Sequence, residues 1–559
     1  MRKQLGPRKF ENTAVIHREK HMYNSRIVIA FLLIMLEAGI PSLATNPSVT
    51  QPQATHLGKV HFANTCSSQV QVEFNSAIAM LHSFQYGLAE KTFNHVLKRD
   101  PQCAIAYWGT AMTLYHMLWD APGAETLKQG RDYLAKARRL RKSARELAYL
   151  NAAQAFYQPE EQLRGKSRVR AYSDAMLHLH QRYPEDNDAT ALYALSLLTL
   201  PSGDGDLNQK ESIEILTTLF AVQPEHPGAA HYLIHATDTT EFAPLGLAAA
   251  RRYAQIAPSS PHALHMPAHI FARLGMWQES IQSNLASLAA AQEATKSGRD
   301  DGSGDALHAM MYLTYSYLQS GDDESARHVV ESVKSIPGAT ASDVINNQAI
   351  LEALYAVETH DWKQAAALVS QPGAFPYVRM RTYWARAIGA ARTGDAVSAR
   401  QDIEKLNQAR AGMMAYMQSV SCRMHTGHPV KSQVSVQQLE AKAWLAWAEG
   451  KPSEALETMR AAAVKEDSFS VESRTVPAYE MLGDLLLELH QPTEALVAYA
   501  TALKESPARF NALAGAARSS QALGNLAAAR SYYELLVKCC NPSAARKEFG
   551  EARLFLSGN

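Results

Sequence analysis

A spacing of 34 residues recurs along this 559-residue chain and constrains its fold more than any other feature. Near the C-terminus, EALVAYATAL and AARSYYELLV align at this offset, which matches Tyr499 with Tyr533. In the middle of the chain, Ala365 and Ala399 have the same separation. A unit repeated at a fixed period buries its apolar face only against its neighbours, so the sequence predicts a stacked repeat array.

Within one repeat, the residue types are those that two packed helices need. The front of the chain reads FQYGLAEKTFNHVLKRDPQCAIAYWG, with a small residue at Ala89, an aromatic at Phe93 and a boundary at Pro101. Small residues let helix backbones approach, and the aromatic ring fills the space between neighbouring pairs. This is the tetratricopeptide pattern, and no stretch alternates as strands do. We therefore expect an all-α, tetratricopeptide-type solenoid of helical hairpins, with about ten or more repeats, some of them divergent.

The N-terminus reads as an export signal. A basic region precedes IVIAFLLIML, and small residues follow at Ser42 and Ala44, which predicts a signal peptide over 1–44. An uncleaved anchor in the inner membrane is the alternative, although a spanning helix needs roughly 20 apolar residues. Both interpretations place the rest of the chain outside the cytoplasm, with membrane contact only through this segment if it is uncleaved.

The rest of the chain divides by composition into four predicted segments. They are a linker over 45–60, a divergent repeat array with a histidine-rich groove over 61–420, a boundary loop over 421–435, and C-terminal repeats over 436–559.

The five cysteines also bear on the compartment, because export permits disulfides. Cys66 and Cys103 flank the first repeat and are the preferred pair. Cys539 and Cys540 are adjacent, and we expect them to be buried helix thiols rather than a bridge.

Several longer stretches carry a resemblance to a known family. They include VHFANTCSSQVQVEFNSAIAMLHSF, HPGAAHYLIHA and HALHMPAHIFARLGMW. On these stretches the chain resembles a family of uncharacterised bacterial exported tetratricopeptide proteins. The resemblance implies the repeat fold and export, and it implies no particular activity.

The charge balance narrows the class of partner. Lys and Arg number 55 against 54 Asp and Glu, so the chain has no large positive net charge that would attract a nucleic acid. The chain has no His-Glu-x-x-His, no phosphate-binding loop and no Gly-x-Ser-x-Gly, which leaves enzymatic activity open. A protein or peptide is the expected partner.

Four histidines recur at the repeat period. His231 and His265 are 34 residues apart, as are His235 and His269. Residues four apart share one helix face, so two such pairs on neighbouring helices can ligate one ion. With Asp238 they form a candidate site for a transition metal such as zinc or copper. Packing histidines and ligand-contacting histidines are the alternatives.

Other residues are predicted to face the same concave groove because of their place in the repeat or their proximity to it. They are His82, Trp108, His116, Tyr232, His262, His308, Arg381 and Trp384.

Two functions follow from this pattern. The first is an exported scaffold that binds a protein or peptide in the groove of the solenoid. The alternative is a metal-binding protein, or a metal-dependent enzyme, that uses the histidine cluster in that groove.

Overall fold

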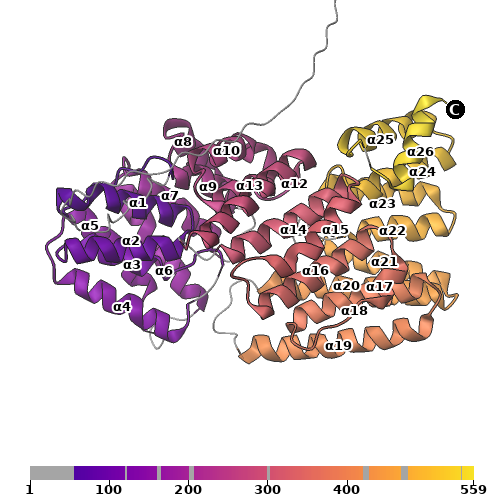
Figure 1. Cartoon of the computed structure of the whole chain (residues 1–559), viewed down its shortest axis with the longest axis horizontal. Coiled ribbons are helices and arrows are strands. Elements are labelled where there is room, and N and C mark those ends of the chain that lie inside the picture. The colour runs from indigo at the N-terminus through magenta and orange to yellow at the C-terminus, as the bar shows by residue number, and fades with distance from the viewer. Residues whose placement is uncertain are drawn as a thin grey trace, which may run out of the picture. The chain divides into compact units, whose positions relative to one another are not determined.

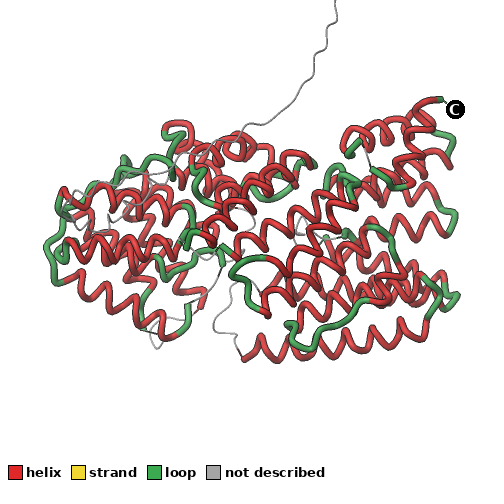
Figure 2. The backbone as a smooth tube through the Cα atoms, in the orientation of Figure 1, coloured by secondary structure: helices red, strands yellow, loops and turns green. Residues whose placement is uncertain are grey.

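A computed structural model describes residues 56–119, 122–159, 165–200, 207–298, 302–419, 427–467, 476–542 and 544–558. Within these ranges every regular element is a helix (Figure 2). Two short 3-10 helices, η1 (Ser68–Val70) and η2 (Val333–Ser335), accompany the α-helices. The all-α fold class predicted from the sequence is confirmed.

Consecutive α-helices form hairpins along the described chain (Figure 1). The first helices are α1 (Gln71–His82), α2 (Tyr86–Arg99), α3 (Ala104–Met112), α4 (Ala124–Arg138), α5 (Ala144–Phe156), α6 (Gly165–Arg182), α7 (Asn187–Leu198), α8 (Leu207–Val222), α9 (Pro227–Ala236), α10 (Ala243–Ile256), α11 (Pro261–His265), α12 (Pro267–Arg273) and α13 (Trp277–Lys296). The later helices are α14 (Ser303–Gln319), α15 (Asp323–Ser332), α16 (Ala341–Glu358), α17 (Trp362–Ala367), α18 (Pro376–Arg392), α19 (Ala396–Ser419), α20 (Gly427–Ala448), α21 (Pro452–Glu466), α22 (Ala478–Glu488), α23 (Pro492–Glu505), α24 (Phe510–Ala522), α25 (Leu526–Cys539) and α26 (Lys547–Ser557). The hairpins run from α1–α2 to α24–α25, as the 34-residue period predicts.

A left-handed residue joins the two helices of many hairpins. Gly275, Gly321 and Gly524 have φ angles of 68°, 72° and 72° at this point. Glycine adopts this conformation without a steric penalty, which is why it commonly follows a helix C-terminus. Phe84 and His360 occupy the same place with φ of 55°, at a cost of about 1–2 kcal/mol each.

The packing of α22, α23 and α24 shows why the repeat needs small residues and an aromatic. A Cβ added at Gly483 would lie 2.7 Å from the Tyr499 ring, and one added at Gly515 would lie 2.2 Å from it. The ring of Tyr499 on α23 therefore fills the space that glycines on the helices before and after it leave open. This is the arrangement inferred from the repeat pattern.

The predicted signal peptide over 1–44 and most of the predicted linker over 45–60 lie outside the described residues. Helix α20 begins at Gly427, inside the segment expected to be a boundary loop over 421–435. One core cluster contains residues from Ala353 to Ala516, so apolar packing continues on both sides of that segment. None of the described helices has the length and apolar character that crossing a membrane requires.

Three neighbouring hairpins bring the histidines together. Their first helices are α9, the pair α11 and α12, and α14, and α12 contacts α9 while α11 contacts α14. Pro267 divides α11 from α12, because proline lacks the N–H that would continue the helical ladder. The segment HALHMPAHIF is therefore two short helices in place of the continuous first helix of an ordinary hairpin.

Candidate metal centre

Six histidines form two groups that we call the first and second trio. The first trio is His231, His235 and His262, and the second trio is His265, His269 and His308. Within each trio, one ligand nitrogen per residue lies within 4.8 Å of the others. The sequence predicted a single site from the four histidines at the repeat period, but the structure assigns two of these four to each trio.

Each trio has the same construction. Two histidines four residues apart come from the first helix of one hairpin, and a third comes from the first helix of the next hairpin. In the first trio, α9 supplies the pair and α11 supplies His262. In the second trio, α11 and α12 supply the pair and α14 supplies His308. The second trio is thus the first trio moved along by one repeat.

In the first trio, the imidazole nitrogens meet at His231. Its Nε2 lies 3.0 Å from Nε2 of His262 and 3.1 Å from Nε2 of His235. Its Nδ1 lies 2.7 Å from the backbone oxygen of His82. A carbonyl oxygen only accepts, so Nδ1 of His231 carries the proton and its Nε2 presents a lone pair to the other two rings.

In the second trio, two lone pairs face each other. Nε2 of His265 lies 3.0 Å from Nε2 of His269. Nδ1 of His265 donates to Oδ1 of Asn284 over 2.6 Å, and Nδ2 of Asn284 donates to the Ser280 carbonyl, which fixes the amide orientation. Nδ1 of His269 donates to Oδ2 of Asp238 over 2.7 Å.

Two neutral rings whose Nδ1 atoms both carry protons have only acceptors at Nε2. Their contact is favourable only with a cation between them, which is either a proton on one ring or a metal ion bound by both. The third histidine of the trio favours the metal, because it supplies a further imidazole within ligand distance.

Asp238 is a positioning residue here, although the sequence suggested it as a ligand. Its Oδ2 accepts from Nδ1 of His269, and its Oδ1 accepts from Nε of Arg273 over 2.9 Å. A carboxylate that orients the outer nitrogen of a ligating histidine is a common feature of metal sites. The hydroxyl oxygen of Tyr312 lies 3.0 Å from the same Nδ1.

The electrostatics keep the first trio neutral. Burial, followed by the charge of His235, holds the pKa of His231 well below its usual value. Burial, and then His269, lowers the pKa of His235 to about 3. Burial, and then His231 and His235, holds the pKa of His262 well below its usual value. Neutral imidazole is the form that binds metal.

The six histidine rings differ in their exposure to solvent. His231, His262 and His265 are buried, while His235, His269 and His308 are half-buried. An ion or small molecule therefore meets the half-buried rings first.

Several residues predicted to face a groove lie in the core instead. Trp108 is 1% exposed and packs against Phe62 and Tyr149, with ring centroids 5.8 and 5.0 Å away. Trp384 is buried, and its Nε1 donates to Oε2 of Glu440 over 2.8 Å. Both indole rings are large apolar surfaces that the hairpins bury, so the expectation that they line an open groove is wrong.

His82 and Tyr232 are also buried, and His82 contacts the first trio through its backbone oxygen, which accepts from His231. Nδ1 of His82 lies 2.9 Å from the Tyr232 hydroxyl, and its Nε2 lies 2.9 Å from Oδ1 of Asp188. His226 contacts the same carboxylate oxygen at 3.3 Å. Each of these histidine nitrogens has a protein partner, so this cluster is a satisfied hydrogen-bond network that fixes the carbonyl to which His231 donates.

The remaining predicted residues lie away from the trios or beside them. His116 stacks on Tyr86 with ring centroids 4.4 Å apart and contacts the Thr113 carbonyl. Arg381 is half-buried on α18.

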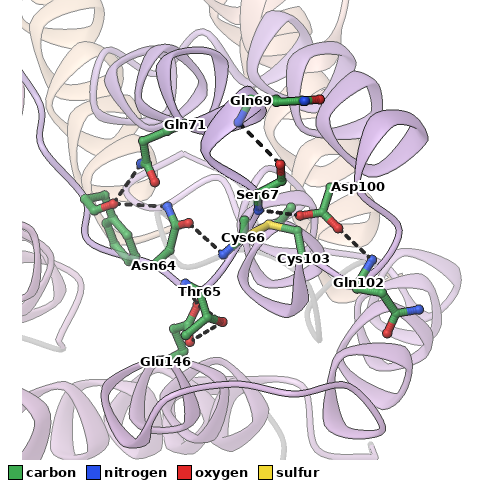
Figure 3. Close-up of a disulfide and its surroundings, with 12 residues drawn as sticks. Asn64, Thr65, Cys66, Ser67, Gln69, Gln71, Asp100, Gln102, Cys103 and Glu146 are labelled. Atoms are coloured by element: carbon green, nitrogen blue, oxygen red, sulfur yellow. Dashed lines mark hydrogen bonds between the residues drawn. A yellow bond between two sulfur atoms is a disulfide. The ribbon is translucent and has the colours of Figure 1, made fainter.

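Cys66 and Cys103 form the predicted disulfide, with Cα atoms 4.6 Å apart (Figure 3). Around it, Asp100 accepts from the Ser67 N–H over 2.7 Å, and Glu146 accepts from the Thr65 N–H over 2.9 Å. Because both sulfurs are bonded to each other, the cluster of these cysteines with Asp100 is not a thiolate metal site. Cys539 and Cys540 are free thiols rather than a bridge, as expected, but Cys539 at the end of α25 is half-buried, and the buried Cys540 follows the helix.

Comparison with known proteins does not assign this chain to a family. No family model matches the chain, and no curated protein matches it. Among solved structures, a human IFIT1 dimer with m7Gppp-AAAA aligns at 12% identity and a TM-score of 0.38, covering 82% of this chain and 94% of that chain. A human IFIT1 dimer with PPP-AAAA aligns at 10% identity and a TM-score of 0.35, with the same coverage. Similarity this low carries no argument about ligands or partners.

Proposed function

We propose that this protein is a helical-repeat protein that binds transition-metal ions through the two histidine trios. The observation that carries the proposal is the 3.0 Å contact between Nε2 of His265 and Nε2 of His269, whose Nδ1 atoms both donate to protein acceptors. A metal ion between these nitrogens converts an unfavourable contact of lone pairs into two coordinate bonds.

The donor set limits the choice of metal. Each trio offers three imidazoles and no thiolate, a set that suits zinc, copper, nickel and iron(II). Calcium and magnesium prefer oxygen ligands, so we expect neither to bind at the trios. Three protein ligands also leave room for a water or a substrate on each ion.

The outer contacts support the same conclusion. His231, His265 and His269 each donate Nδ1–H to a fixed acceptor, and this fixes the tautomer that presents Nε2 to an ion. Histidines that only fill space in a core do not all need to donate from Nδ1 and leave Nε2 as an acceptor. The acceptors come from α1, α13 and the turn after α9, so three separate parts of the fold contribute to it.

The proposal includes a location outside the cytoplasm. It is supported by the signal-like N-terminal sequence and by the Cys66–Cys103 disulfide, since such bridges persist in oxidising compartments. A protein or peptide partner, the other function expected from the repeats, stays a prediction.

Metal titration of the purified chain tests the proposal. The protein is stripped with a chelator, dialysed and titrated with Zn²⁺, while bound metal is counted by elemental analysis. We expect tight binding that the double variant His265→Ala/His269→Ala loses at the second trio. His328→Ala is the matched control, because His328 is exposed on α15 and should bind metal as the parent does. Absence of any bound transition metal in the parent chain would refute the proposal.

A further inference from the structure

We propose that the two trios together hold a pair of copper ions and that this pair binds dioxygen. The inference rests on the proposed metal binding and goes further by naming the metal, its number and the ligand that it takes.

The two trios are direct neighbours. The ring centroids of His235 and His269 lie 6.3 Å apart, as do those of His262 and His265. A separation of this size leaves no space for another layer of side chains between the trios. Ions that share one small bridging ligand lie about 3.5–4 Å apart in two-metal sites, and adjacent trios can place ions as near neighbours.

The ligand set carries no negative charge of its own. Six neutral imidazoles contribute no negative charge, and Asp238, which contacts His269, is already paired with Arg273. Asp305 lies 4.0 Å from Nδ1 of His262 and is 36% exposed. Two divalent ions would bring four positive charges into a largely buried cluster, whereas two cuprous ions bring two. Because uncompensated buried charge is costly, filling both trios at once costs less with two cuprous ions than with two divalent ions.

Two neighbouring cuprous ions can bind dioxygen between them. Three imidazoles leave an open position on each ion, so one diatomic molecule can bind both ions at once. Each cuprous ion gives up one electron, and dioxygen takes both and becomes a peroxide dianion bound to two cupric ions. The bond order between the two oxygen atoms falls by one, two copper–oxygen bonds form, and no proton is needed. The net charge of the centre stays at two, so oxidation adds no buried charge.

An aromatic side chain packs against each trio. The ring of Phe84 is 6% exposed and lies 4.4 Å from the ring of His231, centroid to centroid. Phe84 holds this place with φ of 55°, where several other hairpins have glycine. Tyr312 covers the second trio, with its ring centroid 4.8 Å from those of His265 and His269.

Anaerobic titration with Cu(I) followed by exposure to oxygen tests the inference on the full chain. We expect two copper ions per chain and uptake of one dioxygen molecule per pair. The oxygenated protein should show almost no electron paramagnetic resonance signal, because the two cupric ions are coupled. The full signal of two isolated cupric ions, or binding of only one copper, would overturn the inference.

Variants of the third ligand in each trio provide the second measurement. His262→Ala and His308→Ala each remove one ligand and so weaken the binding of one copper ion. Each variant should therefore retain about one tightly bound copper and take up no dioxygen. After oxidation, each should show the electron paramagnetic resonance signal of an isolated cupric ion. Circular dichroism reports whether the variants fold, and His328→Ala should behave as the parent chain. Oxygen uptake that survives in either variant would contradict a paired centre.

Failure of this inference is distinguishable from failure of the proposed function. A chain that binds zinc at the trios but shows no copper pair overturns the inference alone. A chain that binds neither zinc nor copper overturns both.

Discussion

Two buried polar clusters of this chain are assembled in opposite ways. In the C-terminal hairpins, Arg509 is fully buried and donates to both oxygens of Glu480 over 2.8 Å, to Glu358 over 2.9 Å, and to the Tyr315 hydroxyl over 3.0 Å. In the histidine trios, ring nitrogens face one another, and the inward nitrogens of His231, His265 and His269 are acceptors.

The difference separates a structural cluster from a binding site. Around Arg509, each of these contacts joins a donor to an acceptor, so the protein's own groups pair the guanidinium. Burial raises the pKa of Glu358, and Glu480 adds to this shift while Arg509 opposes it. In the second trio, the facing Nε2 atoms of His265 and His269 are both acceptors, so their contact is favourable only with a cation between them. A buried cluster therefore indicates a ligand when its own members cannot satisfy one another.

The largest expected effect comes from breaking the complete cluster. Arg509→Met leaves Glu358 and Glu480 buried without their partner, and we expect a loss of about 3–5 kcal/mol of stability. Thermal unfolding followed by circular dichroism measures it. Arg518→Met is the matched control, because Arg518 is 36% exposed and pairs with Glu551 at the surface, where ion pairs contribute about 0–1 kcal/mol. Equal destabilisation by the two variants would contradict the comparison.

Breaking the second trio should change metal binding far more than stability. His269→Ala removes a half-buried ring and one of two facing lone pairs, so the metal-free protein should lose little or no stability. Metal affinity at that trio should fall by more than the roughly 10–100-fold that loss of an outer contact costs. Competition with a coloured chelator measures the affinity. A metal-free His269→Ala chain that unfolds as readily as Arg509→Met would show that the trio is structural.

A smaller effect is expected from the positioning carboxylate. Asp238→Asn keeps an oxygen near Nδ1 of His269 but removes the charge that Arg273 also uses. Affinity at the second trio should fall by about 10–100-fold, while the first trio should be unchanged. The same chelator competition resolves the two sites when His262→Ala is used to disable the first. An equal loss at both trios would mean that Asp238 acts on the fold and not on His269.

The smallest effect concerns pH and the C-terminal region. Burial is the largest cause that raises the pKa of Glu466 from its ordinary value of 4.5 to about 7, even though the Ala478 N–H donates to it. The folded state holds this proton more tightly than the unfolded state, so stability is lost as pH rises from about 4.5 to about 7. The loss should be on the order of 1–3 kcal/mol.

Glu466→Gln should flatten this pH dependence of the thermal midpoint. Glu454→Gln, at an exposed position on the same helix, should leave it unchanged. Parallel pH profiles for the parent chain and Glu466→Gln would show that another group is responsible.

The fold could be predicted because its determinants are local and periodic. Ala, Gly and aromatic residues at a fixed spacing specify helices that approach closely, as Tyr499 shows between Gly483 and Gly515. The disulfide was predictable for a similar reason, since Cys66 and Cys103 lie at the two ends of one hairpin.

The candidate site was only partly predictable. Spacing by four placed His231 with His235 and His265 with His269, and the repeat placed His262 and His308 on the same predicted groove, but neither pattern divided the six histidines into two trios. His262 and His308 depend on how α11 and α14 pack, and Pro267 alters the first of these helices. The roles of Asn284 and the His82 carbonyl depend on contacts over 19 and 149 residues of chain, which no local pattern encodes.

The most direct test of the central claim is a crystal structure of the metal-loaded chain with an anomalous difference map at the absorption edge of the metal. We expect a strong peak between Nε2 of His265 and Nε2 of His269, and a second peak at the first trio. A map with no peak at either trio, from crystals in which the six rings remain in place, would contradict the claim that these histidines form a metal centre.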